Sequence, residues 1–254
     1  MSYGIIGKPL SHSFSKAYFE RKFKQSGLQN SYHLFELESV SEFPKLLQTH
    51  PELEGLNVTM PYKSSIIPFL DEIDTEAQAA GAVNVIKISK LNHKIFLKGY
   101  NTDIYGFSQS LNSLNFLTPE HRYALILGTG GAAQAVSCVL NRLGITIRTV
   151  SRYPQSDQLS YNDLDQATIQ KHLLIIQATP VGMYPNPQEV LPFPFSYLTP
   201  QHCCYDLIYN PEKTEFLRRA ETYGAVIKNG LEMLHLQAEK AWGIWQRDYK
   251  APFS

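Results

Sequence analysis

An apolar segment, a glycine loop and an amphipathic segment follow one another near the middle of the chain, and this order restricts the possible folds more than any other feature. Residues 123–127 have the composition of a buried strand, and the glycine loop 128–131 follows at once. Apolar residues then recur at helical spacing over 132–143, and 145–150 is again strand-like. A strand, a glycine loop, a helix and a second strand predict a doubly wound parallel sheet.

The glycine loop has the spacing that binds the phosphates of a dinucleotide. Gly128 allows the tight turn, Gly130 lets a pyrophosphate approach the backbone, and Ala133 permits close helix–strand packing. Free N–H groups and the positive end of the helix dipole hold the phosphates. A glycine turn without a ligand is the alternative. The residues that we expect to contact the cofactor here are Gly128, Thr129, Gly130, Gly131, Ala132 and Ala133.

The end of the second strand distinguishes between the two nicotinamide cofactors. NAD enzymes place an acidic residue there against a ribose hydroxyl, whereas this chain has Ser151 and Arg152. An arginine can pair with the 2′-phosphate of NADP and stack on adenine, so we expect NADP. A solvated arginine without a ligand is the alternative.

The first hundred residues alternate short strands with helices, and this pattern predicts a mixed sheet. Residues 83–88 and 95–100 are expected to form an antiparallel pair, and Pro61 suits the first turn of a helix. The last helix begins near Gly230 and is expected to pack back on the first domain. We therefore expect a two-domain α/β fold, with a mixed-sheet substrate domain (1–103 and 231–254) and a Rossmann-type parallel-sheet NADP domain (104–230).

Polar residues stand at the ends of the predicted strands and in their turns. Asn57 and Thr59 point to the same side of one strand, which suggests that this side faces a cleft. Each cluster is weak on its own, since a Ser-x-Ser before a helix is more often a cap than a ligand site. The clusters include Ser13 with Ser15, Asn57 and Thr59 with Lys63, Asn84, Asn101-Thr102-Asp103, and Gln237.

Taken together, these motifs resemble the shikimate dehydrogenase family over about residues 4–246. The motifs that carry the resemblance, in chain order, are Gly7-x-Pro9-x-x-His12-Ser13-x-Ser15, Asn57-Val58-Thr59-Met60-Pro61-Tyr62-Lys63, Ala80-Gly81-Ala82-Val83-Asn84, Gly99-Tyr100-Asn101-Thr102-Asp103, the glycine loop, Thr179-Pro180-Val181-Gly182-Met183, Asp206-Leu207-Ile208-Tyr209-Asn210-Pro211 and Met233-Leu234-x-x-Gln237. Departures from the family pattern include Ser151, Gln177 and Glu232.

The resemblance implies NADPH-dependent, reversible reduction of 3-dehydroshikimate to shikimate in chorismate and aromatic amino acid biosynthesis. It implies Lys63 and Asp103 as the catalytic pair for proton transfer and orientation. The residues that it assigns to shikimate are Ser13, Ser15, Asn57, Thr59, Asn84, Tyr209 and Gln237. The residues that it adds to the cofactor site are Ser151, Arg152, Thr179, Met183 and Gly230. His12 lies in the first loop, where a hydrogen bond to the turn is the alternative to contact with the substrate.

Charge and cysteine content limit the binding partners that we expect and the cell compartment in which we expect the protein. Lys plus Arg and Asp plus Glu each number 23, so no global field draws nucleic acid or an anionic membrane surface. Three cysteines without a CxxC pattern indicate buried, reduced thiols in a cytoplasmic protein. No signal peptide, membrane span or histidine pattern for a metal site is evident. We expect a small-molecule enzyme, either a monomer or a homodimer.

The sequence leaves three other functions open. A quinate/shikimate dehydrogenase with NAD would share the motifs, although Arg152 argues against a preference for NAD. A non-catalytic shikimate-binding protein on the same frame is the second, and intact Lys63 and Asp103 argue against it. Another Rossmann enzyme, such as a methylenetetrahydrofolate dehydrogenase, is a more distant alternative.

Overall fold

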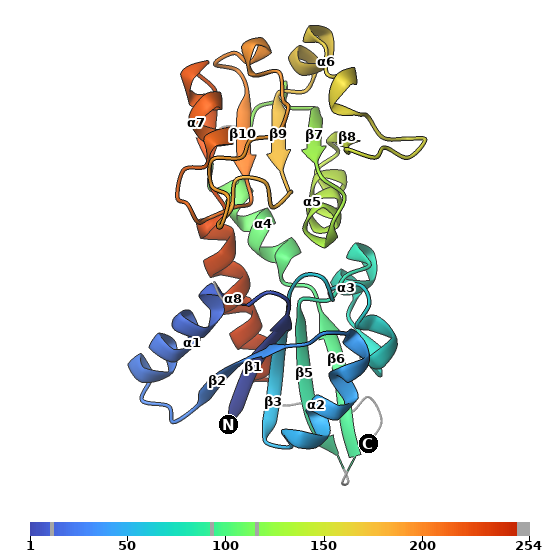
Figure 1. Cartoon of the computed structure of the whole chain (residues 1–254), viewed down its shortest axis with the longest axis vertical. Helices are drawn as coiled ribbons and strands as arrows, with labels where there is room; N and C mark the ends of the chain where they lie inside the picture. The colour runs from blue at the N-terminus through green and yellow to red at the C-terminus, as the bar shows by residue number, and fades with distance from the viewer. Residues whose placement is uncertain (11–12, 92–93, 115–116, 248–254) are drawn as a thin grey trace. The chain divides into compact units, whose positions relative to one another are not determined.

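The structure, a computed structural model, describes residues 1–10, 13–91, 94–114 and 117–247. The chain forms two compact units, and each is described by itself. One contains Met1–Thr102 and the end of the chain from Ala238, and the other contains Asp103–Gln237. Figure 1 shows the elements of both. Among the described helices, none combines the length and apolar character that crossing a membrane requires.

The first unit is built on a mixed sheet, as predicted. Within the described residues its strand order is β2-β1-β3-β5-β6-β4. β1 is parallel to β2 and β3, whereas β5 is antiparallel to β3 and β6. The elements are β1 (Ser2–Gly7), α1 (Phe14–Gln25), β2 (Ser31–Glu36), α2 (Phe43–Thr49), β3 (Leu53–Val58), β4 (Glu72–Ile73), α3 (Thr75–Ala80), β5 (Val85–Leu91), β6 (Lys94–Tyr100) and the second half of α8 (Leu231–Trp245).

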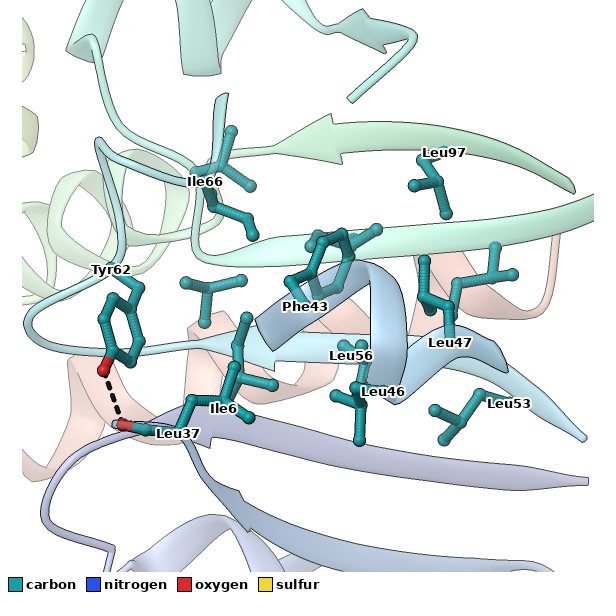
Figure 2. Packing of buried hydrophobic residues seen from close by; sticks show 14 of the residues in the cluster. Ile6, Leu37, Phe43, Leu46, Leu47, Leu53, Leu56, Tyr62, Ile66 and Leu97 are labelled. Carbon is teal, nitrogen blue, oxygen red and sulfur yellow. Dashed lines mark hydrogen bonds between the residues drawn. The ribbon is translucent and has the colours of Figure 1, made fainter. Parts of the chain in front are cut away.

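Residues of β1 alternate between the two faces of this sheet, as the two-residue period of a strand requires. Tyr3 and Ile5 pack in one cluster with residues of α1 and of the last turns of α8. Ile6 packs on the opposite face, where α2 buries Phe43 against the sheet (Figure 2). Apolar side chains thus cover the sheet on both faces.

The last turns of α8 are anchored to β5. The Lys87 ammonium donates hydrogen bonds to the carbonyls of Ile244 and Trp245 at 3.3 Å and to that of Arg247. The Trp245 ring lies beside Gly55, where an added Cβ would stand 2.3 Å from the indole nitrogen. A buried positive charge at a helix C-terminus offsets the partial negative charge of the final carbonyls.

The second unit contains a parallel sheet of the expected Rossmann type. Within the described residues the strand order is β11-β10-β9-β7-β8, and all pairs are parallel. The order reverses between β7 and β9, and ligands of such sheets bind beyond the strand carboxyl ends at this point. The elements are α4 (Asp103–Asn112), β7 (Tyr123–Leu127), α5 (Gly131–Arg142), β8 (Thr146–Val150), α6 (Gln166–Lys171), β9 (Leu174–Gln177), β10 (Cys203–Asp206), α7 (Glu215–Thr222), β11 (Val226–Lys228) and the first half of α8.

The cysteines differ from one another in burial. Cys203 and Cys204 are fully buried on β10, and burial raises the pKa of the Cys203 thiol to about 12. Cys138 is only partly buried, so the expectation that all three are buried is wrong for this residue. None of the three, all of which are described, forms a disulfide.

Candidate active site

The topology of the first sheet brings four of the predicted motifs to one edge. β1 and β3 are parallel, so the loops that follow Gly7 and Val58 leave the sheet on the same side. The antiparallel pairing of β5 with β3 and β6 places the start of β5 and the end of β6 on that side too. Residues 13–15, 59–63, 82–84 and 101–102 therefore share this edge of the first unit, although they are far apart in the sequence.

Asn84 and Asn101 hold the loop after β6. Asn84 Oδ1 accepts the Thr102 N–H at 2.7 Å, and Asn84 Nδ2 donates to Thr102 Oγ1 at 3.0 Å. Asn101 Nδ2 donates to the Ala82 carbonyl at 2.9 Å. The carboxylate of Asp74 accepts the backbone N–H of Asn101, and burial is the main reason that its pKa is raised. The backbone that leads into Asp103 is therefore fixed on both sides.

Asn57 and Ser15 are joined by a tyrosine that the sequence does not single out. Asn57 is buried at the end of β3, and its Oδ1 accepts a hydrogen bond from the Tyr32 hydroxyl at 2.6 Å. The Ser15 side chain lies beside the same hydroxyl, and this contact lowers the pKa of Tyr32, against the larger effect of burial. Asn57 Nδ2 lies 3.4 Å from the Asn84 carbonyl. Three predicted substrate residues thus belong to one chain of polar contacts.

Ser13 has the N-cap position of α1 but makes no side-chain capping hydrogen bond. A capping role, the alternative to a ligand role for this serine, therefore has no support in the geometry. His12 lies outside the described residues. Thr59 is partly buried just beyond β3, and its N–H donates to the Ile6 carbonyl at 2.9 Å.

Lys63 lies in a turn between two buried side chains, those of Tyr62 and Ile66. Tyr62 donates from its hydroxyl to the Leu37 carbonyl at 2.5 Å, and Ile66 is buried in the same core (Figure 2). The Lys63 carbonyl accepts the Val83 N–H at 2.7 Å. The helix predicted from Pro61 is wrong, because the segment forms turns and a short 3₁₀ helix at Ile67–Phe69. Burial of Tyr62 and Ile66 in one apolar cluster stabilises this irregular backbone in place of a helix.

In the second unit, Asp103 begins α4 and is buried. Gly106 follows one turn later on the same side of the helix. An added Cβ on Gly106 would lie 2.7 Å from the Met233 carbonyl and 3.1 Å from Gln237 Cβ. The absence of a side chain at Gly106 therefore lets α4 and α8 approach closely beside Gln237.

The glycine loop has the properties that a pyrophosphate requires. Gly128 has φ +117°, and an added Cβ would lie 2.9 Å from Thr179 Cγ2. Gly130 has φ −76°, and an added Cβ there would meet no atom within 4 Å. The N-terminus of α5 carries no side-chain cap, and Ala133 is buried. Thr129 is exposed, and Gly131 and Ala132 are partly buried in the first turn. Open space beside uncapped N–H groups fits a phosphate.

Ser151 and Arg152 directly follow β8, whose last residue, Val150, accepts the Gly128 N–H at 2.9 Å. Arg152 is exposed, and Ser151 Oγ accepts the Tyr153 N–H at 3.2 Å. Burial raises the pKa of Tyr161 to about 12, and the positive charge of Arg152 opposes that increase. The arginine thus stands two residues beyond the strand that pairs with the glycine loop, where a 2′-phosphate is expected.

Gln177 organises the loop after β9. Its Oε1 accepts the Thr179 N–H at 2.6 Å, and its Nε2 donates to the Val181 carbonyl at 3.0 Å. Both amide atoms of this fully buried side chain are therefore used. The glutamine that departs from the family pattern shapes the loop that carries Thr179, and Met183 at the end of this loop is exposed.

The loop after β10 is held by a buried carboxyl group. Asp206 accepts hydrogen bonds from Thr214 Oγ1 at 2.6 Å and from the Ile208 N–H at 2.9 Å, and burial raises its pKa to about 7. Tyr209 follows in this loop and is partly buried. An added Cβ on Gly230 would lie 2.0 Å from the Leu207 carbonyl, so this glycine packs directly on the loop backbone.

Residues 5–86 match the family described as the shikimate dehydrogenase substrate binding domain. The chain is 37% identical to the shikimate dehydrogenase (NADP(+)) of Desulforamulus reducens, over 95% of this chain and 88% of that protein. For the enzyme of that name from Clostridium beijerinckii, the values are 36%, 96% and 91%.

Solved structures of shikimate dehydrogenases are also similar. The Aquifex aeolicus enzyme aligns with a TM-score of 0.83 at 32% identity, over 97% of this chain and 92% of that one. The Thermus thermophilus shikimate 5-dehydrogenase, solved in complex with NADP(H) and shikimate, aligns with a TM-score of 0.82 at 28% identity, over 99% and 95%.

Proposed function

Because the chain belongs to the shikimate dehydrogenase family, we propose that it catalyses the reversible, NADPH-dependent reduction of 3-dehydroshikimate to shikimate. This reaction belongs to the shikimate pathway, which leads to chorismate and the aromatic amino acids. The convergence of four polar motifs at one edge of the first sheet is the observation that carries the proposal. A small polyhydroxylated acid needs many hydrogen-bonding groups in one place, and this edge supplies them.

The two units are proposed to divide the work. The proposed substrate segments are residues 1–103 and 231–254, and the residues proposed to bind shikimate are Ser13, Ser15, Asn57, Thr59, Asn84, Tyr209 and Gln237. Residues 104–230 hold NADP. The groups proposed to contact it are the glycine loop with Ala132 and Ala133, Ser151, Arg152, Thr179, Met183 and Gly230. The open space at Gly130 and the exposed Arg152 support this assignment.

Lys63 and Asp103 are proposed as the catalytic pair. Bound NADPH supplies the hydride that reduces the ring carbonyl at C3. The Lys63 ammonium stabilises the negative charge that grows on the carbonyl oxygen and donates a proton to it. The Asp103 carboxylate holds this ammonium and accepts a hydrogen bond from a neighbouring substrate hydroxyl. The rigid turn at Lys63 and the fixed backbone before Asp103 support these roles, since proton transfer requires defined positions.

The compartment and the oligomeric state belong to the same proposal. A cytoplasmic location suits buried Cys203 and Cys204 thiols, because a reducing compartment keeps them unpaired. The protein acts as a monomer or a homodimer on a small-molecule substrate.

Quinate oxidation with NAD is the second candidate activity, and Arg152 argues against it because NAD lacks the 2′-phosphate that an arginine would pair with.

A direct assay tests the proposed activity. The purified protein is mixed with shikimate and NADP, and absorbance at 340 nm follows the reduced cofactor. Parallel reactions contain quinate or NAD. We expect the highest kcat/KM for shikimate with NADP. A protein that binds shikimate without reducing NADP would contradict the proposal and favour a non-catalytic binding role.

The catalytic role of Lys63 has its own test. Lys63→Ala should lower kcat by about 10²–10⁴-fold, the usual contribution of a general acid, and change the shikimate KM much less. Lys45→Ala, at an exposed position on α2, is the matched control and should leave both constants unchanged. Near-normal turnover by Lys63→Ala would refute the role.

A further inference from the structure

Tyr32 occupies an unusual place for a residue on an edge strand. β2 pairs only with β1 among the described strands, yet the Tyr32 side chain is 2% exposed. Its hydroxyl donates to Asn57 Oδ1 at 2.6 Å, and the Ser15 side chain lies beside it, where it lowers the pKa of Tyr32. One phenol thus connects β3 with the start of α1, which are the two elements that present Asn57 and Ser15.

The ring of Tyr32 is held as firmly as its hydroxyl. It stacks on Phe19 with a centroid separation of 4.9 Å and an interplanar angle of 11°. Phe19 lies on α1 one turn after Ser15, so the same helix fixes both ends of the tyrosine side chain. Because burial raises the pKa of Tyr32 far above its ordinary value, the phenol keeps its proton at every working pH. It therefore remains a hydrogen-bond donor to Asn57.

The consequence for Asn57 is a fixed amide orientation. Its oxygen accepts from Tyr32 and its nitrogen faces the Asn84 carbonyl at 3.4 Å, so both ends of the amide have a partner in this orientation. Preorganised groups bind a ligand more tightly than mobile ones, because the entropy of ordering them is lost before binding.

We propose that Tyr32 is a positioning residue for substrate binding, which holds Ser15 and Asn57 in register with each other. This inference rests on the proposed function, since those two residues bind shikimate in it. Tyr32 acts through its two partners, so its loss affects the substrate KM far more than the cofactor KM.

Tyr3 supplies a matched control for the hydroxyl. It lies in the same buried cluster, stacks on Trp245 at 4.9 Å and is 1% exposed. Its hydroxyl contacts Gln246 and Met1, which belong to no predicted site. Tyr32→Phe and Tyr3→Phe therefore remove the same atom from the same core, and only the first removal reaches the substrate residues.

Steady-state kinetics and thermal unfolding of both variants test the proposal. Tyr32→Phe should raise the shikimate KM about tenfold, as expected when buried hydrogen bonds are lost, and change the NADP KM less than about twofold. Tyr3→Phe should leave both KM values unchanged, even if its melting temperature falls as much. An unchanged shikimate KM in Tyr32→Phe, or an equal increase in Tyr3→Phe, would overturn the proposal.

A double-mutant cycle distinguishes an effect of Tyr32 through Asn57 from a general destabilisation of the surrounding core. If Tyr32 acts through Asn57, adding Tyr32→Phe to Asn57→Ala should raise the KM much less than it does in the unchanged protein. Additive effects would contradict this route. Absence of shikimate oxidation by the unchanged protein would instead refute the proposed function, and the Tyr32 proposal with it.

Discussion

Asn84 binds Thr102 with both atoms of its side-chain amide, at 2.7 Å to the backbone N–H and 3.0 Å to Oγ1. Asn84 lies just before β5 and Thr102 just after β6, and these two strands run antiparallel. Asp103 is the next residue along the chain. The Asn84 amide therefore fixes the backbone that carries a proposed catalytic carboxylate, in addition to any contact with substrate.

Removal of the Asn84 amide should therefore affect turnover as well as substrate binding. Asn84→Ala leaves the buried Thr102 N–H without its acceptor, which costs about 1–3 kcal/mol of stability. We expect kcat to fall together with an increase in the shikimate KM. Thr102→Val keeps the N–H and loses only Oγ1, so its effect on kcat should be smaller. Steady-state kinetics and urea unfolding check both variants, and a normal kcat in Asn84→Ala would contradict this role.

Two glycines of the nucleotide loop should respond differently to the same substitution. Gly130→Ala adds a methyl group into open space at an ordinary φ of −76°, so the fold should be unaffected. The methyl group would stand where a pyrophosphate approaches, and we expect the NADP dissociation constant to rise about tenfold or more. Gly128→Ala forces φ +117° on alanine and a 2.9 Å contact with Thr179, so it should lower the melting temperature.

Calorimetric titration with NADP and thermal unfolding distinguish these outcomes. A Gly130→Ala protein that binds NADP normally would place the phosphates elsewhere. A Gly130→Ala protein that melts as early as Gly128→Ala would show that the loop is strained at both positions.

Most of the strands and helices of the second unit that we predicted depend on local sequence. The predicted strand at 123–127 coincides with β7, the helical spacing over 132–143 falls on α5, and Gly144 follows that helix with φ +72°. These features are local, because an apolar run and a glycine act on their immediate neighbours. Asn57 and Asn84 also stand near strand ends, as expected, and Ser15 lies in the first turn of α1.

Other features depend on partners that are remote in the sequence. Tyr32 is an ordinary strand residue by composition, and its role becomes visible only when Asn57 and Ser15 lie beside its hydroxyl. Asp74 is predictable as a cap of α3, but its second partner, the Asn101 N–H, comes from the loop after β6. Pro61 suits a helix, yet the burial of Tyr62 and Ile66 imposes turns. Tertiary packing decides each of these cases.

Arg152 should determine the cofactor preference. Arg152→Gln removes the charge proposed to pair with the 2′-phosphate, and a hydrogen bond to a charged group contributes about 1.5–3 kcal/mol. We expect the NADP KM to rise roughly 10- to 100-fold, with little change in the NAD KM. Arg148→Gln, at an exposed position on β8, is the control and should change neither. Equal changes in the KM for NADP and the KM for NAD would show that Arg152 does not bind the 2′-phosphate.

Asp206 should make stability depend on pH near neutrality. Burial raises its pKa from 3.8 to about 7 in the folded protein, so the folded state binds the proton more tightly than the unfolded state. The stabilisation from this proton is complete below about pH 4 and is lost as the pH rises through about 7. Asp206→Asn cannot ionise, and its amide oxygen can still accept the Ile208 N–H.

The melting temperatures of both proteins between pH 5 and pH 9 test this effect. The stability of the unchanged protein relative to Asp206→Asn should decrease across this range by on the order of a few kcal/mol. Asp165→Asn is the control, because the Thr168 hydrogen bond lowers the pKa of Asp165 and its ionisation matters only in acid. Parallel curves for the unchanged protein and Asp206→Asn would mean that Asp206 stays ionised in the folded state, with Thr214 and the Ile208 N–H compensating for its burial.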